Sequence, residues 1–449
     1  MSARGEGSLE APIRHPIEWQ TEAFYDVSAL EKELERVFDI CHGCRRCFSL
    51  CNAFPTLFDA VDATDSGEVG ALDRKVFWEV VDHCYLCDMC FMTKCPYVPP
   101  HPWNVDFPHL MLRAKAARAR SGGLGWRERV LAASDTVGRL AGIPVVVEVV
   151  NAVNASRPGR ALLEKTLGVD RSAPLPRYHS RSARQRLAAL GTVRNPADAP
   201  AAHATADTTG KVALFTTCYG NRNEPQLDED LVAVLEHNGI EVVLLTSERC
   251  CGMPRLELGD LEGVAKLKEH NIPQLAAAVA AGYDVVAPIP SCVLMFKQEL
   301  PLMYPQDPEV QRVAERMFDP FEYLMLRHAA GRLRTDFKAA LGKVSYHVPC
   351  HLRVQNLGLK TRDLLRLIPG STIEPIERCS GHNGTYGLKA RFREASVRIG
   401  RPVVRRVEAA AADYYASDCP MAGEQIQSGL AAPRAPTHPL RLLRIAYGL

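Results

Sequence analysis

Apolar residues follow a helical spacing through the first quarter of the chain. One apolar face begins behind a capping box, in which Ser28 is followed three residues later by Glu31. This face consists of Leu30, Leu34, Val37 and Phe38. A second helix is expected over residues 73–81 and a third from about Pro108. The pattern therefore predicts a helical N-terminal domain.

The third of these helices has a basic face. Its positive side chains are Arg113, Lys115, Arg118 and Arg120. Two interpretations stay open: a face that is simply solvated, or a surface where an acidic redox partner or an anionic lipid docks.

Short apolar segments alternate with helical ones in the second half of the chain. Residues 212–215, 242–245 and 285–289 have the length and composition of buried strands, and helices such as 228–237 lie between them. This alternation predicts small parallel α/β sheets. In such sheets ligands gather at the carboxyl ends of the strands.

The region between these two patterns is less regular. Residues 122–168 have a helical spacing, with a mostly apolar stretch over 140–153 that only Glu148 interrupts. A buried helix or strand is favoured for this stretch, and a position at a membrane interface is the alternative. Proline and small residues over 171–209 indicate a linker or wrapping segment. No segment is expected to span a membrane, which takes about 20 mainly apolar residues.

The charge balance excludes one broad class of function. The 54 Lys and Arg and 52 Asp and Glu residues leave a net charge of +2 on 449 residues, so no nucleic-acid partner is expected. Residues 1–20 have no apolar segment typical of a signal peptide. The 15 cysteines are therefore expected in the reducing cytoplasm, and attachment to the inner face of a membrane is left open.

Eight cysteines between residues 41 and 95 form two runs of similar spacing. Each run contains C-x2-C-x2-C, which supplies three thiolates of a cubane 4Fe-4S cluster, followed by a fourth cysteine. In two-cluster ferredoxins the fourth cysteine of one run serves the other cluster. The first predicted cluster is ligated by Cys41, Cys44, Cys47 and Cys95, and the second by Cys84, Cys87, Cys90 and Cys51.

Zinc sites and disulfides fit these runs less well than iron-sulfur clusters. Zinc needs only two C-x2-C pairs and leaves the third cysteine of each run without a role. A disulfide framework requires an oxidising compartment and usually a small domain. The runs also depart from the bacterial pattern, because four residues precede Cys95 where three are usual and no proline follows Cys51. These departures change the shape of a loop and leave the number of ligands intact.

The second half of the chain contains an internal repeat. Glycine, lysine and valine precede a cysteine by the same interval in both copies, and two further cysteine segments recur downstream. The matched segments are 210–218 and 342–350, 248–252 and 377–381, and 290–292 and 417–419. We therefore expect a tandem duplication in which the cysteines of each copy converge.

Three motifs of the repeat are typical of a known family. They are Cys250-Cys251-Gly252, the glycine-rich segment from Cys379 to Gly387, and Ser417-Asp418-Cys419-Pro420. The chain resembles the cysteine-rich CCG domains of heterodisulfide reductase-type iron-sulfur proteins, including the C subunit of anaerobic glycerol-3-phosphate dehydrogenase. Relatives of this kind pass electrons between a flavoprotein dehydrogenase and a quinone, or reduce a disulfide at an unusual iron-sulfur centre.

The resemblance implies metal ligands in both copies, but the copies differ. The family pattern has five cysteines per copy, and Ser380 and Ala422 stand where copy two lacks two of them. In copy one, the thiols of four cysteines would ligate an additional iron-sulfur centre. They are Cys218, Cys250, Cys251 and Cys292. Copy two offers Cys350, Cys379 and Cys419, and either His382 or His351 would complete a zinc site or a modified cluster. A redox-active centre is therefore expected in copy one.

Three functions are compatible with these patterns. The leading one is an electron-transfer subunit between a flavoprotein dehydrogenase or other redox protein and a quinone at the membrane surface. The second is a reductase that acts on disulfides or thiols at the repeat centre. The third is a scaffold in which the repeats hold structural zinc. The glycine spacing at 381–387 lacks the G-x-G of a dinucleotide site, so the dehydrogenase itself would be another polypeptide.

The fold class that follows is α/β with a helical two-cluster ferredoxin domain. The expected parts are an arm over 1–27, the ferredoxin-like domain over 28–120, a helical segment and linker over 121–209, and repeats over 210–335 and 336–449.

Overall fold

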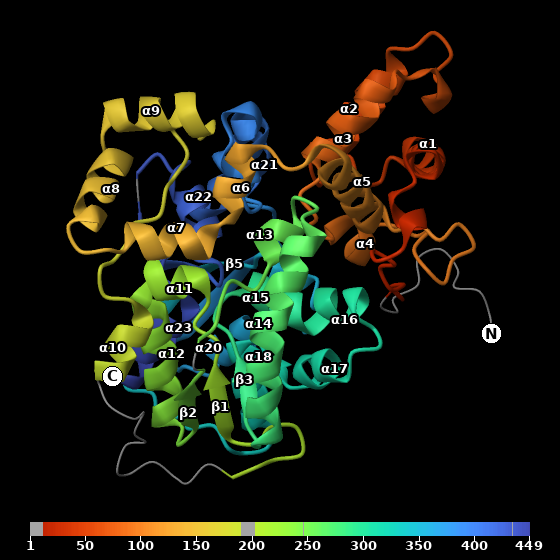
Figure 1. Cartoon of the computed structure of the whole chain (residues 1–449). Coiled ribbons are helices and arrows are strands. Elements are labelled where there is room, and N and C mark those ends of the chain that lie inside the picture. Colours follow the sequence, from red (N-terminus) through yellow and green to blue (C-terminus); the bar gives the residue numbers. More distant parts are fainter. Residues whose placement is uncertain (1–11, 190–202, 246, 433) are drawn as a thin grey trace.

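Two small, all-parallel β-sheets form the centre of the C-terminal half of the computed structural model, which describes residues 12–189, 203–245, 247–432 and 434–449 (Figure 1). The first sheet has the order β2-β1-β3-β4 and the second the order β6-β5-β7. The strands are β1 (Lys211–Leu214), β2 (Glu241–Leu244), β3 (Asp284–Val286), β4 (Met317–Phe318), β5 (Gly342–His347), β6 (Ser371–Ile376) and β7 (Tyr414–Ser417). The predicted parallel sheets are confirmed, and their shared order of three strands fits a tandem duplication.

Helices connect the strands in both repeats, as parallel pairing requires. In the first they are α11 (Cys218–Arg222), α12 (Pro225–His237), α13 (Met253–Leu256), α14 (Leu261–Ala280), α15 (Pro290–Leu294), α16 (Leu300–Met303), α17 (Pro308–Glu315) and α18 (Pro320–Ala329). In the second they are α19 (Cys350–Arg353), α20 (Lys360–Leu365), α21 (Arg393–Ala410), α22 (Pro420–Gln427) and α23 (Pro439–Tyr447). The third expected strand ends early, at Val286, because Pro290 begins α15 shortly afterwards.

Five helices build the N-terminal part of the chain. They are α1 (Val27–Cys44), α2 (Ala53–Asp62), α3 (Arg74–His83), α4 (Met89–Thr93) and α5 (Phe107–Gly122). Phe38 packs edge-on against Phe77, and the ring of Phe54 lies 4.8 Å from that of Phe107, so aromatic side chains fill the space between the helices. The expected capping box at Ser28 is wrong, because Asp26 caps α1 by accepting a hydrogen bond from the amide of Ala29.

The segment before α1 is packed against the rest of the protein. Ile17 and Trp19 are buried, and the indole of Trp19 donates to the carbonyl of Met303 in repeat one at 3.1 Å. Residues 12–25 are therefore a mostly exposed segment that is anchored on repeat one by these two side chains. Residues 1–11 of that expected arm lie outside the described residues.

The segment 122–168 is helical, as its spacing predicted, and the expected linker over 171–209 contains one described helix. The helical segment comprises α6 (Trp126–Ala132), α7 (Ser134–Ala141), α8 (Val146–Ala155) and α9 (Arg157–Leu167), and the helix of the linker is α10 (Ala183–Ala189). The apolar stretch 140–153 is not one buried element, since it turns at 142–145 and leaves Leu140, Val145 and Val149 more than half exposed. Residues 190–202 of the expected linker lie outside the described part.

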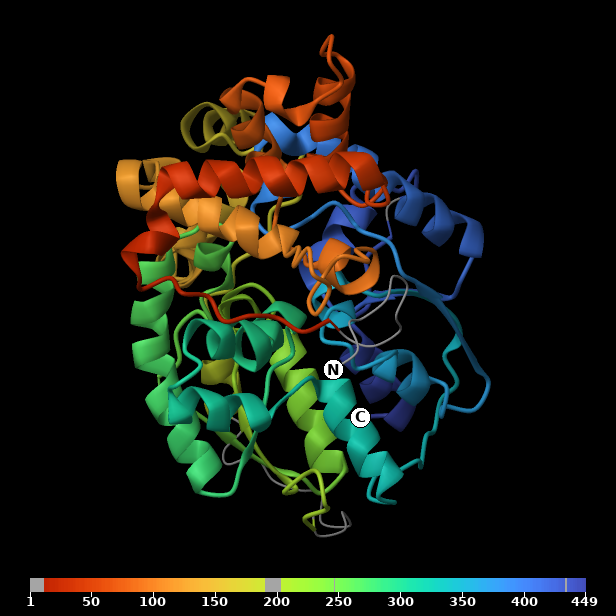
Figure 2. The ribbon, with the colours of Figure 1, turned by 90° about the vertical axis from the view of Figure 1, so that its right-hand side faces the viewer.

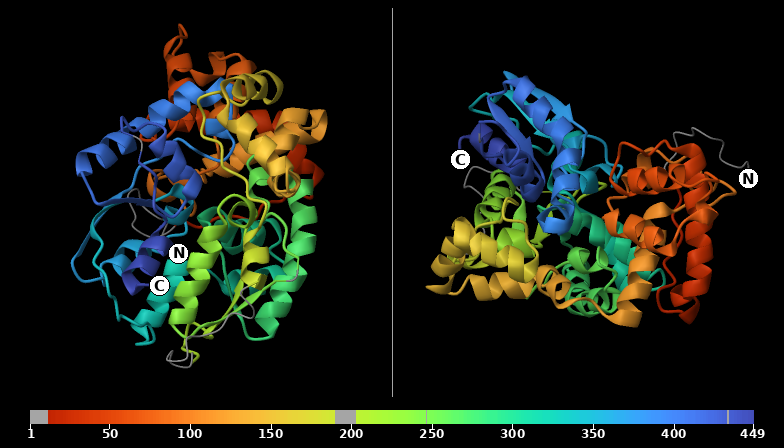
Figure 3. Two further views of the ribbon diagram at one scale, coloured as in Figure 1. Left: turned by 90° about the vertical axis from the view of Figure 1, so that its left-hand side faces the viewer. Right: turned by 90° about the horizontal axis from the view of Figure 1, so that it is seen from above.

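The three parts of the chain surround a common centre. The N-terminal helices lie across one end of the two repeats, as the view turned from that of Figure 1 shows (Figure 2). From above, the repeats lie side by side, with the N-terminal part next to both of them (Figure 3). The helices α7, α8 and α9 lie over the opposite side of the repeats (Figure 1). This arrangement brings cysteines from distant parts of the chain together.

Candidate functional site

The seven cysteines of the two repeats line one cavity with a volume of about 570 Å³. They are Cys218, Cys250, Cys251, Cys292, Cys350, Cys379 and Cys419. Cys87 of the N-terminal part lines the same cavity. The sequence predicted that the cysteines of each copy converge, but it did not predict that the two copies share one space.

Strand ends explain how the cysteines reach this cavity. Cys218 begins α11 after β1, and Cys350 begins α19 after β5. Cys292 lies in α15 after β3, and Cys419 precedes α22 after β7. All four therefore follow the carboxyl end of a parallel strand, where ligands of such sheets gather.

The thiols of repeat one are in close contact. The Sγ atoms of Cys218 and Cys250 are 3.9 Å apart. Hydrogen bonds from Cys218 and Cys251 lower the pKa of Cys250, and the hydrogen bond to Cys250 raises the pKa of Cys251. The hydroxyl of Ser134 in α7 lies 3.3 Å from the Sγ of Cys218 and 3.6 Å from that of Cys250. A hydroxyl at this position can donate a hydrogen bond to a metal-bound thiolate, which influences a cluster's potential.

In repeat two, Cys419 is buried, and Cys350 and Cys379 are partly buried. Burial and the thiols of Cys379 and Cys419 raise the pKa of Cys350. The amide of Gly381 donates to the Sγ of Cys379 at 3.3 Å. Gly381 has a φ of +79°, and a Cβ on it would clash with the carbonyl oxygen of Ser396. The glycine is therefore needed for the close packing of this loop.

The two histidines of copy two line the cavity, and they differ in their hydrogen bonds within the described chain. His351 Nδ1 lies 2.8 Å from the hydroxyl of Ser291. His382 is partly buried, and its buried Nε2 has no hydrogen-bond partner among the described residues. Burial lowers the pKa of His382 to about 4, so its imidazole is neutral at pH 7 and able to ligate a metal.

Electrostatic contacts among the N-terminal cysteines partly follow the two predicted groups. In the first group, burial and the thiols of Cys47, Cys95 and Cys44 raise the pKa of Cys41. Burial raises the pKa of Cys95 to about 11, with Cys44 adding to the effect. In the second group, burial and the thiol of Cys84 raise the pKa of Cys51. The two groups also adjoin, since burial and then the thiol of Cys47 raise the pKa of Cys90.

A buried arginine fixes the loop between two of these cysteines. Arg14 donates to both carboxylate oxygens of Asp88, at 2.7 and 3.0 Å, and to Asp106 at 2.9 Å. Asp88 follows Cys87 and has a φ of +58°, a left-handed conformation that costs about 1 kcal/mol for a non-glycine residue. The bidentate ion pair offsets this cost and holds the second cysteine run in place.

The basic face expected on α5 does not exist as one exposed surface. Lys115 is buried and donates to the carbonyl oxygens of Cys84 and of Glu257. Arg113 bonds the carbonyls of Phe24 and Ala23, while the other two arginines of the set are half-exposed and form ion pairs. These are Arg118 with Asp82 and Arg120 with Glu22. Only Arg118 and Arg120 therefore remain at the surface for either of the two interpretations of this helix.

Aromatic residues join the second cysteine group to repeat two. The hydroxyl of Tyr85 lies 3.7 Å from the Sγ of Cys379. His83 Nδ1 lies 2.9 Å from the hydroxyl of Tyr386, and the rings of Tyr85 and Tyr386 are 5.2 Å apart. The thiols of Cys350 and Cys379 raise the pKa of Cys87, after the larger effect of its burial. Repeat two therefore lies next to the N-terminal cysteines.

Apolar side chains from the segment between the domains cover the other side of the cavity. They come from α6 to α9 and from the proline-containing stretch that follows. Among them are Leu131, Val137, Leu140, Val146, Val150, Leu163, Leu167 and Leu175. Leu140 and Val146 are also exposed to solvent, over 56% and 41% of their surface. These two residues therefore mark an apolar opening from the surface to the cysteines.

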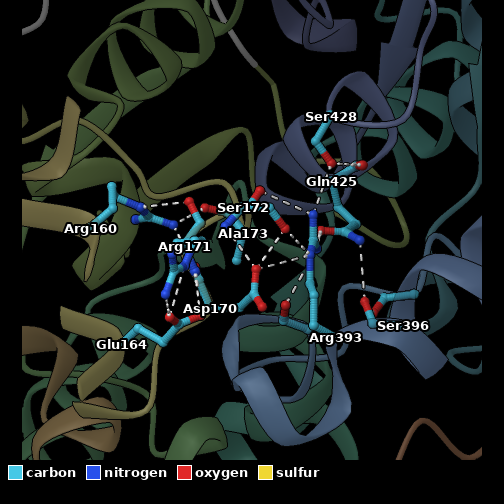
Figure 4. Close-up of polar contacts among 12 residues, drawn as sticks. Arg160, Glu164, Asp170, Arg171, Ser172, Ala173, Arg393, Ser396, Gln425 and Ser428 are labelled. Atoms are coloured by element: carbon cyan, nitrogen blue, oxygen red, sulfur yellow. Dashed lines mark hydrogen bonds and ion pairs between the residues drawn. The ribbon is translucent and has the colours of Figure 1, made fainter. Parts of the chain in front are cut away.

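Buried arginines fasten this cover to repeat two (Figure 4). Arg160 of α9 donates to the backbone carbonyls of residues 170, 171 and 173. Arg393 of α21 donates to the carbonyl of Ser172 at 3.2 Å and to the side chain of Gln425 at 2.8 Å. A stretch distant in sequence is thereby bonded to the helices of the second repeat.

Replacing Arg393 by methionine is expected to loosen this cover. The change leaves the buried acceptor of Gln425 unsatisfied and removes the bond to the exposed Ser172, at a cost of about 1–3 kcal/mol, which raises the open population by about 5- to 150-fold. Limited proteolysis should therefore cut residues 157–180 faster. Arg401→Met, on the exposed side of the same helix, is the matched control. Equal cleavage of both variants would contradict this role of Arg393.

Single-ion sites and membrane-spanning helices are both absent from the described residues. No group of three or more His, Cys, Asp or Glu side chains there is arranged to hold a single metal ion. None of the described helices alone is long and apolar enough to cross a membrane, whereas α7 and α8 together have that composition but are bent by 111° at the break between them.

Several cavity residues escaped the sequence analysis. Ser134 and Tyr85 reach cysteine sulfurs that lie 116 and 294 residues away in the chain. Glu257 and Glu424 are acidic residues of the cavity wall, and they follow no metal or nucleotide motif. No local signal distinguishes them from ordinary surface residues. Only the spatial arrangement identifies them.

Comparison with known proteins gives two kinds of match. Residues 212–297 and 344–427 each match the family of the CCG cysteine-rich domain. The C subunit of the anaerobic glycerol-3-phosphate dehydrogenase of Escherichia coli K12 is 31% identical over 319 residues, which cover 71% of this chain and 76% of that protein.

More distant relatives share a smaller part of the chain. Lactate utilization protein A of an Exiguobacterium species is 29% identical over 40% of this chain and 74% of its own length. The B subunit of the CoM/CoB fumarate reductase of Methanothermobacter marburgensis is 27% identical over 49% of this chain and 42% of its own length. Two of these three relatives are, by name, subunits of redox enzymes.

Proposed function

Because the chain belongs to the family of the C subunit of anaerobic glycerol-3-phosphate dehydrogenase, we propose that it is an iron-sulfur electron-transfer subunit. It would receive electrons from a flavoprotein dehydrogenase partner and deliver them to a quinone. The observation that carries this proposal is the single apolar cavity lined by the thiols of both repeats and by Cys87. An apolar cavity with redox-capable ligands on its wall suits a lipophilic electron acceptor.

The donor sets fit iron-sulfur clusters. Two groups of four N-terminal thiols offer sulfur alone, which is the ligand type that such clusters require. Burial and the thiols of Cys95 and Cys44 raise the pKa of Cys47 to about 12. Thiols crowded in this way keep their protons without a cation, so loading of iron would release protons and stabilise the fold. The crossed assignment, with Cys95 in the first group and Cys51 in the second, is retained as part of the proposal.

The repeats would hold the remaining redox centres. Copy one offers four thiols, and copy two offers three together with His382 and His351. A bound iron-sulfur cluster supplies single-electron storage. The protein contributes position, burial and hydrogen-bond donors such as the hydroxyls of Ser134 and Tyr85. Metal analysis of the purified protein distinguishes zinc from a modified cluster in copy two.

We further propose that the acceptor enters from a membrane surface. Around the turn between α7 and α8, Val145 is 78% exposed and Val149 is 59% exposed, next to the cavity opening at Leu140 and Val146. Residues 121–189 contain eleven Lys and Arg and five Asp and Glu, a net charge of +6 compared with +2 for the whole chain. Apolar side chains that project from a basic segment suit an anionic lipid surface.

The test combines vesicle binding with quinone reduction. Dithionite-reduced protein carrying its clusters is mixed with phosphatidylglycerol vesicles that contain ubiquinone, and its reoxidation is followed by absorbance. A Val145→Glu/Val149→Glu variant is expected to bind vesicles at least about tenfold more weakly, because two charges would enter the lipid interface. It should also reoxidise correspondingly more slowly there, yet retain its rate with a water-soluble quinone.

A matched control separates the surface from a general effect of added charge. Val397 of α21 is 43% exposed, on repeat two. Val397→Glu should leave vesicle binding unchanged. Loss of binding in both variants would reject the proposed surface, and a wild-type protein that no quinone reoxidises would reject the proposed function itself.

The second candidate is a reductase of small disulfides, which the paired thiols of Cys218 and Cys250 favour because they lie 3.9 Å apart at the cavity wall. In that case a small organic disulfide would reoxidise the reduced protein and quinones would not. The same experiment therefore decides between the two acceptors.

A further inference from the structure

An acidic side chain lies in the cavity wall between the cysteines of the two repeats. Glu257 follows α13, is 7% exposed, and lines the cavity. It is an electrostatic neighbour of Cys250 in repeat one and of Cys350 in repeat two. Within the described chain its carboxylate accepts no hydrogen bond, whereas its backbone carbonyl accepts one from Lys115 Nζ at 3.1 Å. No described donor therefore competes with a ligand of the cavity for this carboxyl group.

The glycine-rich loop of repeat two is shaped around this carboxylate. A Cβ on Gly384 would clash with Glu257 Oε2, and Gly384 has a φ of +58°. The carboxylate therefore rests directly on the backbone of that loop, at a position where a side chain has no room. The adjacent residues His382, Asn383 and Thr385 line the same cavity. The position of Glu257 is thus fixed by both repeats.

A charged side chain connects this position to solvent. Lys389 is an electrostatic neighbour of Glu257. Its Nζ is 3.9 Å from Glu128 Oε1, and the side chain of Glu128 is 38% exposed. The three residues form a sequence of alternating charge from the cavity wall to the surface.

The protonation equilibrium of Glu257 lies near neutral pH. Burial raises its pKa to about 7, Lys115 and Lys389 lower it in part, and Cys250 raises it further. The titratable groups that face it are these three and Cys350. A carboxyl group of this kind is well matched to general acid catalysis at physiological pH.

We propose that Glu257 is the proton donor to the quinone bound in the cavity, and that it is recharged from solvent past Lys389 and Glu128. The inference rests on the proposed function for its acceptor. The quinone takes up two electrons from the reduced iron-sulfur centres and two protons. Each carbonyl oxygen becomes a hydroxyl, and the product is a hydroquinone. Glu257 gives up one proton for each transfer and takes one back from solvent.

The test compares acceptors that do and do not require protons. Reduced wild type and Glu257→Gln, both with their clusters, are reoxidised by a water-soluble quinone or by ferricyanide. With the quinone the variant is expected to react about 100-fold more slowly, the usual loss when a general acid is removed. With ferricyanide, which accepts an electron without a proton, the two proteins should react alike. The wild-type quinone rate should fall as the pH rises above about 7, and the variant should lack this dependence.

Two controls keep the inference independent of the proposed function. Infrared spectra of the wild type should contain a protonated-carboxyl band near neutral pH that Glu257→Gln loses, whichever acceptor the protein uses. Glu224→Gln removes a partly buried carboxyl group outside the cavity wall, whose pKa burial also raises to about 7, and should keep the quinone rate.

Quinone reactivity and the infrared band decide different claims. If the wild type reacts with quinone and Glu257→Gln reacts equally fast, the role of Glu257 is rejected and the proposed function stands. If no quinone reoxidises the wild type, the proposed function fails, and the infrared band still decides whether Glu257 carries a proton. Where Glu257→Gln loses its cluster signals, Lys389→Met takes its place. The Lys389→Met variant should slow the second and later turnovers more than the first, because Glu257 must be reprotonated between turnovers. Equal slowing of all turnovers would contradict a proton route past Lys389.

Discussion

Replacing Cys95 by serine is expected to remove the cluster assigned to Cys41, Cys44 and Cys47 and to leave the other N-terminal cluster in place. Cys95 belongs to the second cysteine run in sequence, but its thiol lies with the first group, next to Cys44. A cubane that loses one of its four thiolates is destabilised. Iron analysis should therefore report about four fewer iron atoms per chain, the content of one cubane.

The reciprocal variant is the matched control for this prediction. Cys51 belongs to the first run in sequence, but its thiol is an electrostatic neighbour of Cys84. Cys51→Ser should therefore destroy the second cluster and spare the first, which electron paramagnetic resonance of the two variants can distinguish. If each substitution instead removes the cluster of its own run, the crossed assignment is wrong.

Replacing Cys379 by alanine is expected to interrupt the route between the N-terminal clusters and the cavity. Cys379 lies 3.7 Å from the hydroxyl of Tyr85, and its thiol is an electrostatic neighbour of Cys87. Repeat two is thus the copy that adjoins the second N-terminal group. With a ligand of that copy removed, we expect quinone reduction to fall by at least about tenfold, while dithionite still reduces the N-terminal clusters.

Cys251→Ala provides the comparison in repeat one. If electrons reach repeat two first, the Cys251 variant should still transfer them from the N-terminal clusters to the centre of repeat two, as rapid-freeze spectroscopy would record. The reverse result, with transfer lost in the Cys251 variant and kept in the Cys379 variant, would assign the first step to repeat one. The sequence favoured repeat one as the redox-active copy, because it retains more cysteines. The position of Cys379 next to Tyr85 and Cys87 makes repeat two an equally good candidate for the redox-active copy.

Patterns of short range were predicted well from the sequence. The strands near 212, 242 and 285 and the helix ending at His237 lie within a few residues of their expected positions. The apolar segments of β1 and β3 are buried on both faces of a parallel sheet, which leaves a clear signal in the sequence. The capping residue of α1 was missed, since Asp26 and Ser28 are both good caps and only the backbone conformation decides between them.

Predictions that depended on solvent exposure were less successful. The basic residues of α5 looked like a surface because they recur along one helix, yet Lys115 is buried against Cys84 and Glu257. The apolar stretch 140–153 looked buried, yet it turns back at the surface. A sequence gives the polarity of each side chain. Whether that side chain is exposed depends on neighbours from distant segments, which bond its polar groups or cover its apolar surface.

The sequence by itself determined the ligand types, the duplication and the family. Thiols at C-x2-C spacing within one turn are a local property, and so is the recurrence of cysteines after apolar strands. Only the tertiary structure decided that both repeats face one cavity, that repeat two adjoins Cys87, and that Glu257 meets Gly384 there. The physical reason is that these contacts join segments more than 100 residues apart. They depend on how the sheets and helices pack, and that packing leaves no periodic or spacing signal along the chain.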